Sequence, residues 1–325
     1  MFYSINPTTG KEIARYPLHS EAERAALLEA AADAQARLAA MPVEVRAEGL
    51  VRLAKVLDDH TEALAALAVR EMGKPIRQAR AEVQKCARAC RYYAAHGPAM
   101  LGPEPAEVDA ARAYVVYQPL GVVLAIMPWN FPYWQVVRFL APALVAGNTG
   151  LLKHAETVTG CAFALADAVA TAGFDPAVLG VLLAGHDAIP GVIADDRVAA
   201  VTVTGSERAG RAVGALAGQA LKPSVLELGG SDAFIVLSDA DLDEAVRVGV
   251  EARVQNTGQS CIAAKRFIVE EAIYDAFAQR FTEAMAALRV GDPMDEATEI
   301  GPIARADLRD TLHRQVEQAV AHGAR

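Results

Sequence analysis

The chain has 325 residues, a formal net charge of −9 and a hydrophobic content of 53%. This composition excludes a disordered protein, and the acidic balance argues against nucleic acid as a partner. The longest apolar run, residues 121–127, is far shorter than the roughly 20 residues of a membrane-spanning helix. Residues 1–7 lack the basic and apolar regions of a secretory signal. We therefore expect a cytoplasmic protein without a nucleic-acid or membrane partner.

The N-terminal third is mainly helical by pattern. A short alternating run covers residues 12–16, and helices rich in alanine and leucine are expected at 21–40, 43–71 and 75–95. Residues 97–106 contain three prolines and two glycines and are expected to be a connector. A strand is expected at 112–118, and as an exposed edge strand it is a candidate for pairing with another subunit.

From residue 121, strands and helices alternate. The expected strands are 121–127, 149–153, 178–183, 198–203 and 224–228, and the expected helices are 132–146, 158–172, 188–195 and 206–220. Because these strands are apolar nearly throughout, they predict a parallel sheet covered on both faces. The fold class is therefore a doubly wound α/β domain, which binds ligands at the carboxyl ends of its strands.

A second α/β region follows Gly229. Strands are expected at 233–237 and 266–269, and helices at 241–254, 272–288 and 305–322. The predicted division is a first domain of residues 1–107 and 119–228, an oligomerisation arm at 108–118, and a second domain at 229–325. The second domain is short for a partner domain, so we expect an incomplete α/β catalytic domain.

One cysteine has a distinctive setting. Cys261 follows a small, polar turn at 256–260, where a substrate can approach. This favours a nucleophile, although a lone cysteine is more often a small core residue. Cys86 and Cys90 lie one helical turn apart with no histidine nearby, so no metal site is expected. Nothing in the sequence demands disulfides, which suits a reducing compartment.

Two motifs at strand ends suit a nucleotide. Lys153 and Glu156 can hold ribose hydroxyls and phosphate, or they can form a solvated charge pair. The stretch 205–210 opens a helix whose amides would face a phosphate, or it is a plain helix capped by Ser206. The dinucleotide fingerprint G-x-G-x-x-G is absent.

Two polar side chains suit acyl chemistry. Asn130 lies between aromatic residues in the rigid turn 127–132, where its amide can point at developing negative charge or can satisfy the turn. Glu227 ends a strand before Gly229 and Gly230. It can act as a general base if it is partly desolvated, or it is a surface carboxylate. No Ser-His-Asp arrangement stands out.

Together these motifs resemble the aldehyde dehydrogenase superfamily. Five stretches carry the resemblance in the family's order and spacing: 127–132, 147–156, 204–210, 227–230 and 256–261. Residues 226–232 and 255–267 are most similar to the bacterial succinate-semialdehyde dehydrogenase branch. The resemblance implies an NAD(P)-dependent oxidation of an aldehyde to a carboxylic acid, with succinate semialdehyde as the expected substrate.

The resemblance also implies roles for individual residues. Cys261 attacks the aldehyde and passes through a thiohemiacetal and a thioester, Asn130 and the Cys261 N–H hold the oxyanion, and Glu227 activates water. Glu156 should repel a 2′-phosphate, so NAD is favoured, with NADP as the alternative. The implied cofactor contacts are Met127, Pro128, Trp129, Lys153, Ala155, Glu156, Gly205, Ser206, Leu228 and Gly229.

Two departures from the family matter. Arg138 matches one of two arginines that bind the substrate carboxylate, but the second position holds Gln255, with Arg253 as an alternative cation. Family members continue for roughly another 130 residues, so we expect a fragment of a protein that is a homo-oligomer at full length. The alternatives are another short-chain aldehyde as substrate, a catalytically silent fragment and, less favoured, an esterase that uses Cys261 without a cofactor.

Overall fold

The computed structural model describes residues 1–324, which divide into two compact units. Unit 1 comprises residues 1–4, 14–67 and 80–228, and unit 2 comprises residues 5–13, 68–79 and the chain from residue 229.

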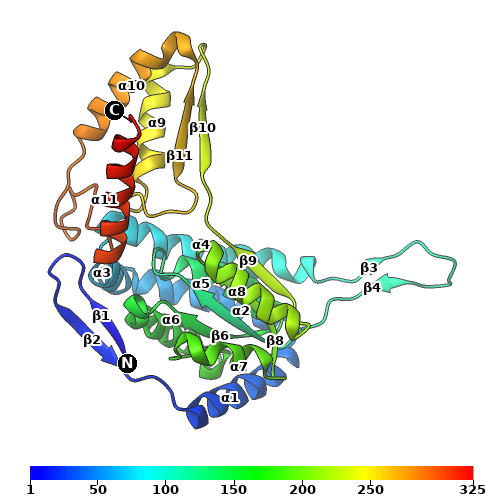
Figure 1. Ribbon diagram of the computed structural model, residues 1–325. Coiled ribbons are helices and arrows are strands. Elements are labelled where there is room, and N and C mark those ends of the chain that lie inside the picture. The colour runs from blue at the N-terminus through cyan, green and yellow to red at the C-terminus, as the bar shows by residue number, and fades with distance from the viewer. Residues whose placement is uncertain (325) are drawn as a thin grey trace. The chain divides into compact units, whose positions relative to one another are not determined.

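A five-stranded parallel sheet forms the centre of unit 1 (Figure 1). Its spatial order is β7-β6-β5-β8-β9, so the chain builds outward from β5 on one side and then on the other. Every strand pairing is parallel, which confirms the predicted doubly wound α/β class. The strands are β5 (Val122–Met127), β6 (Thr149–His154), β7 (Leu179–Val181), β8 (Val198–Thr204) and β9 (Ser224–Glu227).

The contacts of successive residues along β6 show that helices cover both faces of this sheet. The Thr149 hydroxyl donates to the carbonyl of Ala31 in α1 (Glu21–Ala39) at 3.1 Å. Gly150, one residue on, lies against Phe139 of α5 (Trp134–Val145). Successive strand residues point to opposite faces, so α1 and α5 cover different faces. The helices after β6, β7 and β8 are α6 (Thr159–Thr171), α7 (Ile189–Ala194) and α8 (Glu207–Gln219).

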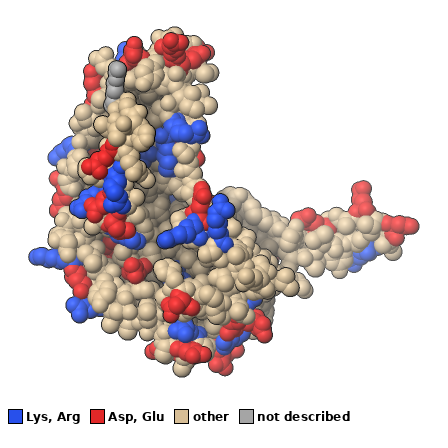
Figure 2. Space-filling view, in the orientation of Figure 1, with Lys and Arg blue, Asp and Glu red and all other residues tan. Residues whose placement is uncertain are grey.

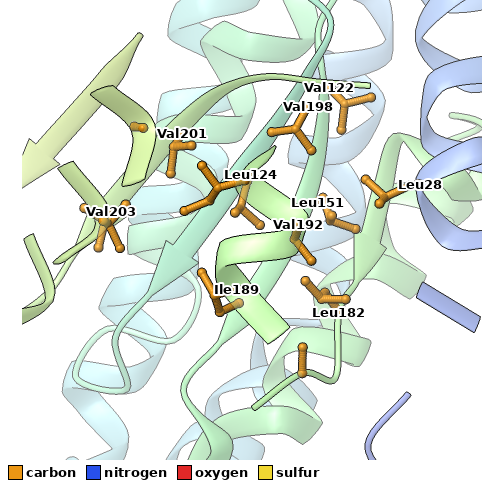
Figure 3. Packing of buried hydrophobic residues seen from close by; sticks show 14 of the residues in the cluster. Leu28, Val122, Leu124, Leu151, Leu182, Ile189, Val192, Val198, Val201 and Val203 are labelled. Atoms are coloured by element: carbon orange, nitrogen blue, oxygen red, sulfur yellow. The ribbon is translucent and has the colours of Figure 1, made fainter. Parts of the chain in front are cut away.

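One hydrophobic core of unit 1 lies on the α1 side of the sheet. Figure 3 shows Leu124, Leu151 and Val201 from three neighbouring strands near Ile189 and Val192 of α7. Full burial of such side chains stabilises the fold by about 1.5–3 kcal/mol each. This burial explains why β5 and β8 read as mainly apolar runs in the sequence, whereas the edge strand β9 is exposed along its length.

The N-terminal helices differ from the sequence prediction at two places. The expected helix 43–71 is interrupted at His60, whose φ of −105° and ψ of 13° lie outside the helical region. The expected connector at 97–106 begins instead as the end of a helix, because Gly97 packs closely against Val145. The observed helices are α2 (Val43–Asp59), α3 (Thr61–Met72) and α4 (Ile76–Met100).

Short strands replace the longer ones expected elsewhere. The expected strand 112–118 is reduced to β4 (Tyr114–Val115), which pairs antiparallel with β3 (Glu104–Pro105) in an arm that extends from the sheet of unit 1 (Figure 1). On the face shown in Figure 2, charged side chains lie on the outer half of the arm, and its base is uncharged. Near the N-terminus, β1 (Phe2–Ile5) was not expected, and it forms a two-stranded sheet with β2 (Glu12–Tyr16).

Unit 2 is built on two parallel strands, β10 (Asp232–Val236) and β11 (Ala264–Val269). Val236, Val246, Val250 and Phe277 form its core. The helices of this unit are α9 (Leu242–Val254), α10 (Glu271–Ala286) and α11 (Ala306–Ala321). Among the described residues, no helix has the length and apolar character needed to cross a membrane.

Residues 5–13 and 68–79 group with unit 2, whereas the predicted division placed them in the first domain. Gly73 has a φ of +80°, and a Cβ there would lie 2.7 Å from the ring of Pro302 and 2.9 Å from the ring of Pro7. The Ile76 N–H donates to the Pro293 carbonyl at 2.8 Å. These close contacts join segments that are far apart in the sequence.

Candidate functional site

The sheet of unit 1 has its topological switch point between β5 and β8. The next two strands along the chain, β6 and β7, lie on one side of β5, whereas β8 and β9 lie on the other side. Ligands of open α/β sheets bind outside the carboxyl ends of the strands at such a point. Met127 ends β5 and Thr204 ends β8. The motifs predicted to bind a nucleotide therefore follow strands whose carboxyl ends share this edge.

Lys153 lies near the carboxyl end of β6, and Glu156 follows that strand at this edge. Lys153 is 9% exposed, and its ammonium lies 5.5 Å from the centre of the Phe2 ring. Burial lowers the pKa of Lys153, and the Glu156 carboxylate acts in the opposite direction. Glu156 is exposed at the start of a 3₁₀ turn, Glu156–Val158. A shielded cation beside an accessible carboxylate offers a donor and an acceptor to a ribose diol.

The N-terminus of α8 follows β8. The Ser206 hydroxyl accepts a hydrogen bond from the Ala209 N–H at 3.3 Å, so Ser206 caps the helix. A Cβ at Gly210 would lie 2.5 Å from Leu228, so the glycine lets Leu228 pack against the first turn. The Gly205 N–H donates to the Glu227 carbonyl at 3.0 Å. Gly229 has open space where a Cβ would stand.

Asn130 lies in the turn between β5 and α5 and is half-buried. The helix that follows begins on a buried carboxylate: Glu82 Oε1 accepts the N–H groups of Tyr133 and Trp134 at 2.8 and 2.9 Å. An anion at a helix N-terminus satisfies amides that have no partner within the helix. This contact fixes where α5 starts, immediately after the Asn130 turn.

Arg138 and Glu227 meet on unit 1. Arg138 Nη1 lies 3.5 Å from Glu227 Oε2, and Arg138 Nη2 donates to Thr204 Oγ1 at 3.2 Å. The three residues line a groove of about 400 Å³ together with Met127. Gln135, which was not expected at the site from its sequence context, also lines this groove. Gln135 is 3% exposed, and among residues 1–324 its Oε1 has no hydrogen-bond partner. Its spacing of three from Arg138 along one helix was the available signal.

Cys261 is the accessible thiol of the described chain. The other three cysteines are buried in helices of unit 1. Burial raises the pKa of Cys90 to about 12, so that thiol stays protonated. The loop before Cys261 has consecutive left-handed residues, Asn256 and Thr257 with φ of 57° and 59°. A β-branched residue rarely adopts this conformation, and strained backbone clusters at functional sites.

Two cations hold this loop through its carbonyl groups. Lys265 Nζ donates to the Cys261 carbonyl at 2.7 Å and to the Ser260 carbonyl at 3.2 Å. Arg253 donates to the carbonyls of Gly258 and Ala264, each at 2.8 Å. Arg253 therefore has a structural part in the loop, which counts against it as a second cation for the substrate.

Gln255, which occupies the position of the second substrate-binding arginine, caps the carboxyl end of α9. It is exposed, and its N–H donates to the Glu251 carbonyl at 3.1 Å. Residues 1–324 contain no cluster of three histidine, cysteine or acidic side chains suited to a metal ion.

Comparison with known proteins decides the family. The model of the aldehyde dehydrogenase family matches residues 1–325. The chain belongs to this family. Succinate semialdehyde dehydrogenase [NAD(P)+] Sad of Escherichia coli is 53% identical over 322 residues, covering 99% of this chain and 70% of that protein. Succinate-semialdehyde dehydrogenase [NADP(+)] of Mycolicibacterium paratuberculosis is 51% identical over 328 residues, covering 99% of this chain and 69% of that protein.

The fold agrees with a solved member of the family. The crystal structure of succinic semialdehyde dehydrogenase from Streptococcus pyogenes in complex with NADP+ has a TM-score of 0.97 and 35% identity. The match covers 99% of this chain and 71% of that one. The predicted aldehyde dehydrogenase-like fold is thereby confirmed.

Proposed function

We propose that the protein is an NAD(P)+-dependent aldehyde dehydrogenase that oxidises succinate semialdehyde to succinate. The observation that carries the proposal is the identity of 53% and 51% to two succinate-semialdehyde dehydrogenases across nearly the whole chain. The accessible Cys261 in a strained loop supports the assignment of the nucleophile.

The residues at the switch point fit a dinucleotide. Lys153 and Glu156 face the ribose and phosphate of the adenosine half, and the N-terminus of α8 at Gly205 and Ser206 offers amide donors to phosphate. Met127, Pro128, Trp129, Ala155, Leu228 and Gly229 complete the proposed contacts. When bound, NAD(P)+ accepts a hydride from the substrate carbon.

The side chains of this protein perform the acyl chemistry. The Cys261 thiolate attacks the aldehyde carbon, and the carbonyl electron pair moves to oxygen. The Asn130 amide and the Cys261 N–H donate to this oxygen, where charge develops. When the hydride leaves the substrate carbon, the oxygen electron pair re-forms the C=O bond and a thioester results. Glu227 then takes a proton from water, which attacks the thioester carbon. The C–S bond breaks, and the carboxylic acid and the Cys261 thiol are released.

Arg138 supplies a cation for the substrate carboxylate. Arg138 lies in α5, the helix that follows the Asn130 turn. Its guanidinium lines the same groove as Glu227. Gln255 is a weaker candidate for the same end of the substrate, because an amide contributes no charge. Since only one cation is assigned, another short-chain aldehyde is the second candidate for the substrate.

Either dinucleotide is compatible with the residues described. The exposed Glu156 favours NAD+, because a carboxylate repels a 2′-phosphate. The names of the two relatives include NAD(P)+ and NADP(+). We therefore assign NAD(P)+ and leave the preference to a direct measurement of both affinities.

We also propose that the protein acts as a homo-oligomer in the cytoplasm. The β3–β4 arm exposes Val108, Tyr114, Val115 and Val116, each at 49% or more. An exposed two-stranded arm with apolar side chains suits pairing with a second copy. Four cysteines with no disulfide among them suit a reducing compartment.

Substitution of Cys261 tests the activity. Wild-type protein is expected to reduce NAD+ or NADP+ with succinate semialdehyde, and Cys261→Ala is expected to abolish this reduction. Cys161→Ala is the matched control, because it removes a buried thiol. Turnover retained in Cys261→Ala would refute the nucleophile. Dinucleotide binding without oxidation of any aldehyde in a panel would favour the catalytically silent alternative.

A further inference from the structure

His154 spans the turn that carries Asn130. Its Nε2 lies 2.8 Å from the Pro132 carbonyl oxygen, and its Nδ1 lies 3.3 Å from the Met127 carbonyl oxygen. Met127 ends β5, and Pro132 precedes α5. One imidazole therefore contacts both ends of the turn, from the neighbouring strand β6. His154 is 3% exposed, so it is enclosed on all sides by protein.

The contacts of His154 determine which ring nitrogen carries the proton. The Ala155 N–H donates to Nδ1 at 2.9 Å, so Nδ1 is an acceptor. Nε2 therefore bears the hydrogen and donates to the Pro132 carbonyl. Burial lowers the pKa of His154 to about 4, so the ring is neutral near pH 7. The neutral ring has one N–H, and it points at the turn.

Other contacts around the turn show where His154 acts. The Met127 carbonyl accepts the Ala155 N–H at 2.9 Å, so the β5 end is held by a backbone hydrogen bond. On the other side, Glu82 holds the amides of Tyr133 and Trp134. His154 supplies the side-chain donor to the Pro132 carbonyl between these anchors, two residues after Asn130.

We propose that His154 is a positioning residue that holds the turn so that the Asn130 amide meets the substrate oxyanion. This inference rests on the role proposed above for Asn130. A donor must lie within about 2.7–3.1 Å of the developing oxyanion, and small displacements are costly to catalysis. Misplacement of a catalytic group by about 1 Å can lower the rate by up to about 100-fold.

Hydrolysis of 4-nitrophenyl acetate without a dinucleotide provides the assay. Acylation of Cys261 by this ester forms the same kind of oxyanion, and effects on Lys153 or Glu156 do not enter the measurement. His154→Leu removes the donor, and His154→Gln retains an N–H near the Nε2 position. Thr149→Val is the matched control, because it deletes another buried hydrogen bond to a carbonyl, at the far end of β6.

His154→Leu is expected to lower kcat roughly 10- to 100-fold with KM changed by less than about twofold, since the contact acts in the transition state. His154→Gln is expected to recover most of the rate, and Thr149→Val to keep the wild-type rate. In a double-mutant cycle, His154→Leu is expected to cause no further loss when Asn130→Ala is present. ¹⁵N NMR of the free protein is expected to show the neutral Nε2–H tautomer at pH 7.

Several results would overturn the inference. A His154→Leu rate equal to that of Thr149→Val, a multiplicative loss in the cycle, or an Nδ1–H tautomer would each do so. If His154→Leu does not fold, equal rates for His154→Gln and the shorter His154→Asn would refute the role, and a faster His154→Gln would support it. If Asn130→Ala acylates at the wild-type rate, the proposed role of Asn130 fails as well. A slow Asn130→Ala beside a fast His154→Leu refutes His154 alone.

Discussion

Glu227 and a substrate carboxylate are expected to compete for Arg138. The Glu227 carboxylate lies 3.5 Å from Arg138 Nη1, and Thr204 occupies Nη2. A carboxylate ligand that binds the guanidinium must displace Glu227 or share the cation with it. Glu227→Gln removes the competing charge while it preserves the size of the side chain. The variant is therefore expected to bind succinate more tightly than the wild type.

The exposure of the pair sets the size of this effect. The side chains of Arg138 and Glu227 are 35% and 53% exposed, so solvent screens their attraction. Ion pairs of this kind contribute about 0.2–1 kcal/mol. Because 1.4 kcal/mol corresponds to a tenfold change, relief of the competition should tighten succinate binding about 1.4- to 5-fold. The advantage should shrink as salt concentration rises.

Succinate affinity is measured by calorimetry, which requires no turnover and is unaffected by slower thioester hydrolysis in Glu227→Gln. Glu207→Gln is the matched control, because it makes the same change in net charge on α8, where Glu207 pairs with Arg211. Arg138→Gln should weaken succinate binding by roughly tenfold or more, since a hydrogen bond to a charged group is lost. Butanal, which has no carboxylate, should show no such dependence on Arg138.

Equal succinate affinity in Glu227→Gln and Glu207→Gln would show that the affinity depends only on net charge and not on the contact between Glu227 and Arg138. Weaker binding in Glu227→Gln than in the wild type would show that Glu227 assists the ligand. Either result would refute competition for Arg138.

Three further outcomes are expected. Glu156→Gln should shift the ratio of NADP+ to NAD+ affinity upward by about fivefold, because it removes one exposed charge; an unchanged ratio in titrations of both dinucleotides would contradict this. Gly73→Ala should lower the free energy of unfolding by at least about 1 kcal/mol more than Gly10→Ala. Both glycines have positive φ, but of the two only Gly73 lies against proline rings. An equal loss of stability in urea titrations would refute the steric argument. The pKa of His154 is about 4, below its ordinary value, so the unfolded chain binds more protons and stability should fall as pH drops from about 6.5 to 4. His154→Gln should show a shallower fall over that window, and parallel curves would count against the buried neutral ring.

Local sequence determined much of the fold. The apolar strands and intervening helices from residue 121 predicted a covered parallel sheet, because the strands of such a sheet are buried on both faces. Cys261 was selected for its polar turn. Its difference from Cys86, Cys90 and Cys161 is visible in the structure, where the other thiols are buried.

The sequence was less informative where distant segments meet. The end of α4 was expected to be a connector because of Gly97 and Pro98, yet the helix continues to Met100. Gly97 gives α4 a close approach to Val145, a contact between residues far apart in the chain. Propensity describes the preference of the local backbone and contains no information about such a partner.

By itself, the sequence determined the alternation of elements and the residues at the strand ends, because both follow from local patterns of apolar, polar and turn-forming side chains. Only the tertiary structure decided the strand order β7-β6-β5-β8-β9, which places the switch point beside Met127 and Thr204. It also decided that Arg138 pairs with Glu227 and that His154 spans the Asn130 turn. These contacts join side chains from different strands and helices, and their distances are set by packing of the sheet.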